Sequence, residues 1–268
     1  MVSEPVLLVE DVGAVRLLTL NRPDARNALS GELITALYRA LVTADADPTV
    51  NVVVLTGADP AFCAGVDLKE AARDGTAYFA RFDTEDCISQ VARTRIPIIG
   101  AVNGAAFTGG LELALGCDFL IASERAVFAD THVRVGVLPG GGMTARLPRV
   151  VGGAMARRLS MTGEVIDAVR AERIGLVTEV VEHGRLLPRT LEIAAAIAEV
   201  PRAAMQALKE MYVTGAAPAV DHALAAERAI ASRLTPDLAD LDARRQAVTA
   251  RNRAQIAGPS TATPNVNG

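Results

Sequence analysis

Short runs of nearly unbroken apolar residues alternate with amphipathic stretches along roughly the first 180 residues. Apolar runs of this length, bounded by Gly, Pro or Asn, are typical of strands buried on both faces of a parallel sheet. The first two runs flank the turn sequence at residues 11–13 and predict a hairpin. The predicted strands are residues 6–10, 15–20, 50–56, 97–102, 119–122, 127–129 and 177–181.

The amphipathic stretches predict helices. The clearest begins after Ser30, a favourable N-cap residue, and carries Leu33, Leu37 and Leu41 at helical spacing to about residue 46. Further helices are predicted at residues 67–73, 76–94, 109–116, 144–150, 153–162 and 167–174. After residue 182 the chain is Ala-rich and only helices are predicted, at residues 187–199, 202–214, 220–234 and 238–253.

This order of elements defines the expected organisation. Alternating strands and helices indicate an α/β fold with a mostly parallel sheet and right-handed crossovers. We expect an α/β core over residues 1–182 and a helical region over residues 183–256. Residues 257–268 are rich in Pro, Ser, Thr, Asn and Gly and are expected to be disordered.

Composition and charge exclude several classes of function. The 268 residues carry a net charge of −4, which gives no general attraction to nucleic acid or an anionic membrane. Only 3% of them are aromatic, too few for a base-stacking platform. The three cysteines lack zinc-site spacing and indicate reduced thiols, and three histidines exclude a His-rich metal site. With neither a secretory signal nor an apolar run of ~18 residues, we expect a cytoplasmic protein without a membrane span.

Two Gly/Ala-rich segments, residues 61–69 and 104–112, each follow a buried strand and precede a helix. Ligands of open α/β sheets bind at this edge, and a helix start presents unpaired N–H groups. Two such starts facing each other would provide the two donors of an oxyanion hole. Each segment alone is explained better as a packing turn, and neither is a P-loop or a dinucleotide fingerprint.

Glu112 is the most informative carboxylate. It lies in the first turn of an otherwise apolar helix, three residues after Gly109. The helix dipole alone would favour a carboxylate there. Burial would also make it a usable general base, about one turn from the candidate oxyanion donor.

The chain resembles the crotonase superfamily, the enoyl-CoA hydratase/isomerase group, from about residue 6 to residue 253. Together the motifs are highly specific, although each alone is not. They are Asn21-Arg22-Pro23 with Asn27-Ala28-Leu29, residues 62–68 (FCAGVDL), residues 102–113 (VNGAAFTGGLEL), Cys117-Asp118, and Gly136 with Pro139-Gly140-Gly141-Gly142.

The resemblance implies a crotonase-like spiral of ββα turns, with C-terminal helices that assemble trimers or dimers of trimers. It also implies an acyl-CoA thioester as substrate, whose oxygen lies between the N–H groups of Val66 and Gly109. Because the substrate carries coenzyme A, no metal or separate cofactor is expected. The positions that correspond to the CoA-binding residues are Arg26, Ala28, Ala64, Val66, Asp67, Leu68 and Gly109. For Arg26, a solvated loop position is an equal alternative.

Hydratases of this family use two glutamates, and this chain departs from that pattern. Glu112 corresponds to the first, which activates water, but His132 stands at the position of the second. A histidine can exchange protons near neutral pH, so we expect His132 to handle the Cα proton. The alternative is a structural, hydrogen-bonded His132, with Glu112 handling both protons in a one-carboxylate mechanism. Asp130 is a weaker candidate for that role, and Cys63 is expected to pack rather than react.

The last helix also departs from the family pattern, in which an aromatic residue and a Lys reach a neighbouring subunit's CoA. Ala247 and Ala250 align there, so Arg251 or Arg253 is the expected substitute. We also expect residues 70–83 to shape the acyl pocket.

The expected activity is hydration of a trans-2-enoyl-CoA. The alternatives are another crotonase reaction (isomerisation, decarboxylation or thioester hydrolysis) and a protein that binds acyl-CoA without turnover. The acyl chain length, the pathway and the choice between trimer and hexamer do not follow from the sequence.

Overall fold

The computed structural model describes residues 4–233 and 241–257. Its larger sheet has six strands in the order β1-β2-β3-β5-β7-β10. β1 and β2 pair in the antiparallel fashion of a hairpin, and all other neighbours are parallel, which confirms the predicted mostly parallel sheet. The strands are β1 (Leu7–Val12), β2 (Val15–Leu20), β3 (Val52–Gly57), β5 (Ile98–Val102), β7 (Phe119–Ser123) and β10 (Glu179–Val181).

A second, smaller sheet contains very short strands in the order β4-β6-β8-β9. Three of its strands each follow a strand of the first sheet and precede a helix, so that the chain repeats a ββα unit. The predicted spiral of ββα turns is therefore confirmed. The strands are β4 (Ala61–Cys63), β6 (Ala105–Phe107), β8 (Val127–Ala129) and β9 (Ile166–Asp167).

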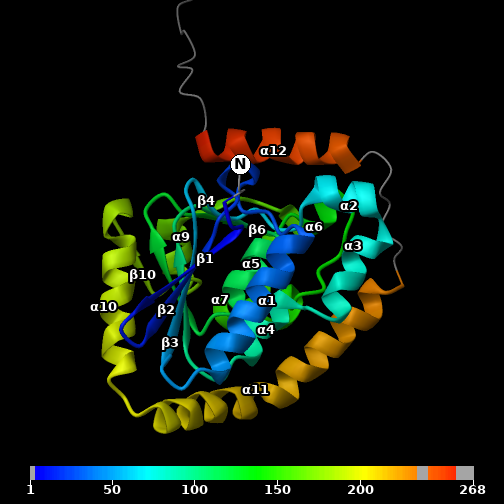
Figure 1. Cartoon of the computed structure of the whole chain (residues 1–268). Helices are drawn as coiled ribbons and strands as arrows, with labels where there is room; N and C mark the ends of the chain where they lie inside the picture. The colour runs from blue at the N-terminus through cyan, green and yellow to red at the C-terminus, as the bar shows by residue number, and fades with distance from the viewer. Residues whose placement is uncertain (1–3, 234–240, 258–268) are drawn as a thin grey trace, which may run out of the picture.

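The larger sheet is covered on both faces. α1 (Gly31–Ala46) begins as predicted, with the Ser30 hydroxyl accepting the Leu33 N–H at 3.2 Å. Its buried leucines belong to the main core, where each stabilises the fold by about 1.5–3 kcal/mol through removal of apolar surface from water. On the other face, α10 (Leu186–Ala198) packs on β2, β3, β5 and β7 (Figure 1).

The helix predicted over residues 76–94 is wrong. Two helices and a 3₁₀ turn replace it, because Asp86 caps a new helix by accepting the Ser89 N–H at 2.9 Å. The remaining elements of the core are α2 (Leu68–Asp74), α3 (Thr76–Ala80), α4 (Cys87–Arg93), α5 (Gly109–Leu115), α6 (His132–Val135), α7 (Met143–Val151), α8 (Gly153–Thr162) and α9 (Ala168–Arg173), with 3₁₀ helices at Pro23–Ala25, Arg81–Asp83 and His183–Arg185.

Two long helices complete the described chain. The predicted break between residues 214 and 220 is wrong, because α11 (Arg202–Ala231) continues through Gly215 and Pro218. The neighbouring alanines, which are the best helix formers, favour this continuous helix. α12 (Leu241–Ala257) contacts α2 and α6 of the core. The first three residues of the helix predicted at 238–253 and most of the tail predicted to be disordered, residues 258–268, lie outside the described residues. No helix in the described ranges has the length and apolar character needed to cross a membrane.

Candidate active site

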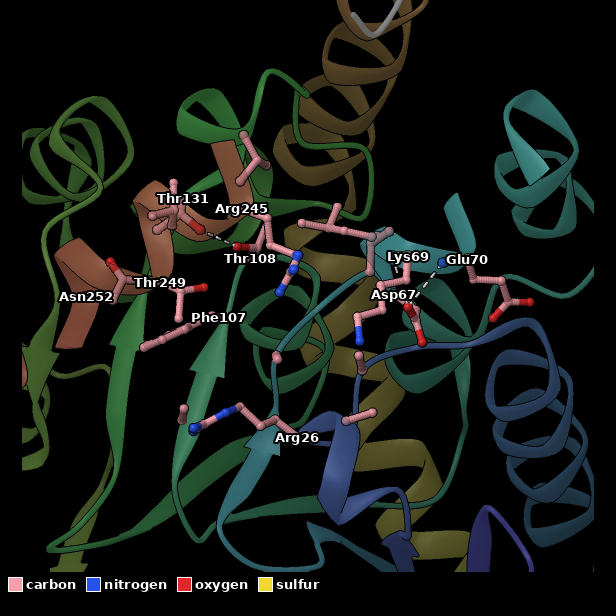
Figure 2. A pocket seen from close by; sticks show the side chains of 18 of the residues that line it. Arg26, Asp67, Lys69, Glu70, Phe107, Thr108, Thr131, Arg245, Thr249 and Asn252 are labelled. Atoms are coloured by element: carbon pink, nitrogen blue, oxygen red, sulfur yellow. Dashed lines mark hydrogen bonds between the residues drawn. The ribbon is translucent and has the colours of Figure 1, made fainter. Parts of the chain in front are cut away.

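A cavity of roughly 710 Å³ lies between the small sheet, α2, α6 and α12 (Figure 2). Six of the residues that the sequence assigned to substrate binding line it. They are Arg26, Ala28, Ala64, Val66, Asp67 and Leu68. His132 also lines the cavity, whereas Gly109 and Glu112 lie behind its wall.

The two Gly/Ala-rich turns approach each other so closely that side chains are excluded. A Cβ on Gly65, whose φ is +92°, would lie 2.9 Å from the Phe107 carbonyl and 3.0 Å from the Gly109 nitrogen. A Cβ on Gly110 would lie 2.0 Å from the Cys63 carbonyl oxygen. Glycine at these positions is what allows the backbone of one turn to contact the backbone of the other.

The N–H groups of Val66 and Gly109 lie at these two turns. The Leu29 N–H donates to Gly65 O at 2.8 Å and the Asp67 N–H donates to Leu29 O at 3.4 Å, so the pairing skips the N–H of Val66. Gly109 is the first residue of α5 and follows Thr108 at the cavity wall. Within residues 4–233 and 241–257, neither Val66 N–H nor Gly109 N–H donates to a protein acceptor.

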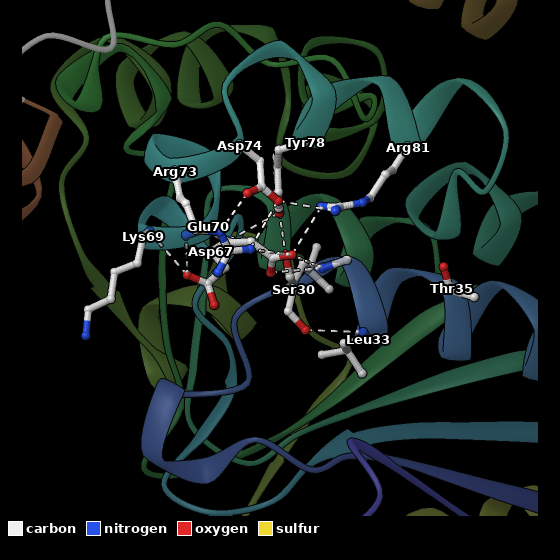
Figure 3. A network of polar contacts seen from close by, with 12 residues as sticks. Ser30, Leu33, Thr35, Asp67, Lys69, Glu70, Arg73, Asp74, Tyr78 and Arg81 are labelled. Carbon is white, nitrogen blue, oxygen red and sulfur yellow. Dashed lines mark hydrogen bonds and ion pairs between the residues drawn. The ribbon is translucent and has the colours of Figure 1, made fainter.

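A network around the first turn fixes its position (Figure 3). Asp67 caps α2 by accepting the N–H groups of Lys69 and Glu70, both at 3.2 Å. The buried Tyr78 hydroxyl donates to Leu29 O and accepts the Asp67 N–H at 3.3 Å. These contacts hold Asp67 in place at the cavity wall.

Glu112 is almost completely buried, with 3% of its surface exposed. Its Oε1 accepts the N–H groups of Gly141 at 2.9 Å and Met143 at 3.1 Å, while Oε2 lies 3.5 Å from His132 Nε2. Glu112 does not itself line the cavity, and its contact with His132 connects it to that space. The sequence predicted that Glu112 lies in the first turn of a helix, which is α5, but it did not predict the donors at residues 141 and 143.

His132 lies between two carboxylates. Its Nδ1 is 2.7 Å from Oδ1 of Asp130, and its Nε2 faces Glu112. Burial opposes protonation of the ring, but the two carboxylates outweigh burial and raise the pKa of His132 to about 10. For Asp130, burial acts in the raising direction, yet the hydrogen bond to His132 keeps the pKa of the carboxyl lowered. The contacts with Glu112 and Asp130 therefore favour the protonated form of His132.

Basic side chains from distant parts of the chain reach the cavity. Figure 2 shows Arg26, Lys69 and Arg245 directed toward it, and Arg253 lines it as well. Of the two arginines expected to substitute in the last helix, Arg253 is placed here. Arg251 instead donates to the carbonyls of Gly163 at 2.6 Å and Thr162 at 3.0 Å.

Some wall residues were not predicted individually. The hydroxyls of Thr108 and Thr131 bond each other at 2.8 Å beside the cavity. Phe79, Val135 and Val137 supply apolar wall, and Phe79 comes from the segment expected to shape the acyl pocket. Burial raises the pKa of the Cys63 thiol to about 12, so Cys63 packs as expected rather than acting as a nucleophile.

The fold and the site define an α/β protein of ββα units with a buried Glu–His pair beside two glycine turns. Residues 10–250 match the enoyl-CoA hydratase/isomerase family, and the chain belongs to it. A probable enoyl-CoA hydratase of Rhizobium meliloti is 46% identical over 78% of this chain and 81% of its own length. A probable peroxisomal enoyl-CoA hydratase of Arabidopsis thaliana is 38% identical over 85% of this chain and 86% of its own.

A solved structure agrees with this assignment. The enoyl-CoA hydratase crystal structure from Mycobacterium smegmatis superimposes with a TM-score of 0.78 at 48% identity. The match covers 86% of this chain and 98% of that one.

Proposed function

We propose that this protein is an enoyl-CoA hydratase that adds water across the double bond of a trans-2-enoyl-CoA. The observation that carries the proposal is the buried pair of Glu112 and His132, 3.5 Å apart beside the two glycine turns. One member is suited to accept a proton and the other to donate one. Addition of water to a conjugated thioester requires both.

Besides a proton acceptor and a proton donor, hydration requires stabilisation of the negative charge on the thioester oxygen, and the free N–H groups of Val66 and Gly109 supply it in this proposal. The thioester oxygen lies between Val66 N–H and Gly109 N–H in the proposed complex, where both donors stabilise the charge that develops on that oxygen. Each donor of such an oxyanion hole contributes roughly 3 kcal/mol to lowering the barrier.

The reaction then balances without a covalent intermediate. Glu112 removes a proton from water, and the hydroxide oxygen forms a bond to C3 as the electrons of the double bond move toward the thioester. His132 Nε2 delivers its proton to Cα, and the carbonyl re-forms. Afterwards, protonated Glu112 returns a proton to neutral His132, and the starting charges are restored.

Asp130 supports this cycle by binding Nδ1 of His132 at 2.7 Å. This hydrogen bond directs Nε2 toward Glu112 and favours the cationic form of the ring. Asp130 is therefore a positioning residue rather than the second acid, the alternative that the sequence had left open.

The proposal extends to the rest of the ligand. Arg26, Lys69, Arg245 and Arg253 offer positive charge for the phosphates of coenzyme A, and α12 of the same chain forms one wall of the cavity. Within this scheme no metal or further cofactor takes part, because the thioester itself provides the activated carbonyl.

Assembly and location belong to the proposal as well. α11 exposes Leu208, Met211 and Tyr212, and apolar surface of this kind supports packing between subunits in a trimer or a dimer of trimers. The described cysteines are free thiols, which supports a reducing compartment such as the cytoplasm. Size-exclusion chromatography with light scattering and cell fractionation test these two points.

A panel of acyl-CoA thioesters tests the activity. With short and long trans-2-enoyl-CoA, we expect loss of the conjugated-thioester absorbance and a product heavier by one water. An unchanged mass with a shifted double bond would indicate an isomerase, loss of carbon dioxide a decarboxylase, and free coenzyme A a thioesterase. Binding by calorimetry without any product would contradict catalysis altogether.

A further inference from the structure

Residues 141–144, the turn that donates hydrogen bonds to Glu112, also donate hydrogen bonds to a second buried carboxylate. Glu227, on α11, has 6% of its surface exposed. Its Oε1 accepts the Gly142 N–H at 2.7 Å, and its Oε2 accepts the Thr144 N–H at 2.7 Å together with the Thr144 hydroxyl. Glu227 lies 85 positions from Gly142 in the sequence, so only the fold brings them together.

The two glutamates divide four successive N–H groups between them. Glu112 takes those of Gly141 and Met143, and Glu227 takes those of Gly142 and Thr144. The alternation means that the backbone presents one pair of donors toward α5 and the other pair toward α11. A rotation of this turn would therefore weaken both sets of hydrogen bonds together.

The turn has little freedom to find another arrangement. Gly142 has φ +105°, and a Cβ there would lie 2.2 Å from Arg146 Nη1 and 3.2 Å from Leu224 Cδ2. Arg146 Nη1 also donates to the Gly141 carbonyl at 2.6 Å. Glu227 and Arg146 thus hold the turn at residues 141–144 in one closely packed conformation.

We propose that Glu227 is a positioning residue for the catalytic carboxylate, an inference that rests on the proposed function. By fixing the turn, it directs the Gly141 and Met143 N–H groups at Oε1 of Glu112. That arrangement leaves Oε2 free to face His132 and the reacting water. Through Glu227, a helix of the C-terminal region sets the geometry of the base on α5.

The direct test is Glu227→Gln. Glutamine keeps the size of the side chain but places an amide NH₂, a donor, against one of the backbone donors. Loss of a buried hydrogen bond to a charged group predicts a fall in kcat of about tenfold or more, with KM changed less than about twofold. The matched control is Glu210→Gln, an exposed position on the same helix, which should leave both constants unchanged.

A second variant covers the case in which Glu227→Gln does not fold. Thr144→Val removes only the hydroxyl that donates to Oε2 and leaves the backbone N–H in place. It should lower kcat in the same direction by a smaller factor, again without a matching rise in KM. Unchanged kcat in Thr144→Val, or in a folded Glu227→Gln, would overturn the inference.

A double-mutant cycle tests the positioning role of Glu227 separately from the proposed role of Glu112 as the base. If Glu227 acts through Glu112, Glu227→Gln should not lower the residual kcat of Glu112→Gln further. An equal factor in both backgrounds, or a rise in KM alone, would overturn the positioning role. Full activity in Glu112→Gln alone would instead contradict the proposed function.

Discussion

His132 Nε2 lies 3.5 Å from Oε2 of Glu112, and the opposite ring nitrogen lies 2.7 Å from Asp130. Each ring nitrogen thus faces a carboxyl group, which favours the protonated form of the ring. In this arrangement the base and the acid of the proposed reaction lie side by side before substrate arrives. A second glutamate would need its own proton to serve as the acid.

Replacing the acid tests its role. His132→Gln keeps a polar side chain but cannot transfer a proton, so kcat for hydration should fall by about 10²–10⁴. The exposed His222→Gln, on α11, is the control and should retain activity. Steady-state rates with a single enoyl-CoA decide the matter, and a His132→Gln rate within a factor of two of the control would contradict the assignment.

The pH profile tests the charge on His132. Because its pKa is raised to about 10, kcat should stay level through neutral pH and fall as pH rises through about 10. Asp130→Asn removes one of the carboxylates that favour the cation, so the alkaline limb should move to lower pH. An alkaline limb at the same pH in both proteins would rule out this role for Asp130.

The same charge contributes to stability, with a definite sign. The folded pKa of His132 lies above the unfolded value of 6.5, so its contribution is fully present below pH 6.5. It is lost as pH rises through about 10. Urea unfolding of wild type and His132→Gln should therefore show a difference in unfolding free energy that shrinks between pH 6 and pH 10, and a constant difference would refute the account.

Substitution of Gly141 tests whether catalysis requires a fixed position of the Glu112 carboxylate. A Cβ there would lie 2.7 Å from Glu112 Oε2 and 2.8 Å from Ile88 Cγ2, so Gly141→Ala must displace the carboxylate. We expect kcat to fall by about tenfold or more, as small misplacements of reacting groups are costly. Gly140→Ala, where a Cβ meets nothing within 4 Å, is the matched control. Equal activities of the two variants would argue against a defined position for Glu112.

Gly110 tests the contact between the two turns. Its Cβ would lie 2.0 Å from Cys63 O, so Gly110→Ala should force the turns apart and destabilise the fold by about 1–3 kcal/mol or more. Gly184→Ala, with open space around its Cβ, should change stability far less. Thermal unfolding compares the pair, and a melting temperature for Gly110→Ala equal to that of the control would disprove the close contact.

The sequence predicted local features well and distant ones poorly. Ser30 capped its helix as expected, because a cap depends on neighbours in the chain. The sequence did not predict the strands β4 and β6, because three residues are too few to carry a periodic signal and these segments become strands only by pairing within the small sheet. The contact of Glu227 with Gly142 had no sequence signal at all, since it joins positions 85 residues apart.

Hydration by wild type and Glu112→Gln tests the central claim most directly. The glutamine keeps the shape of the side chain but removes the base, and mass spectrometry of the product reports whether water has been added. The account predicts rapid formation of a 3-hydroxyacyl-CoA by wild type and a rate lower by at least about 10² in the folded variant. Equal rates of water addition by the two proteins would contradict it.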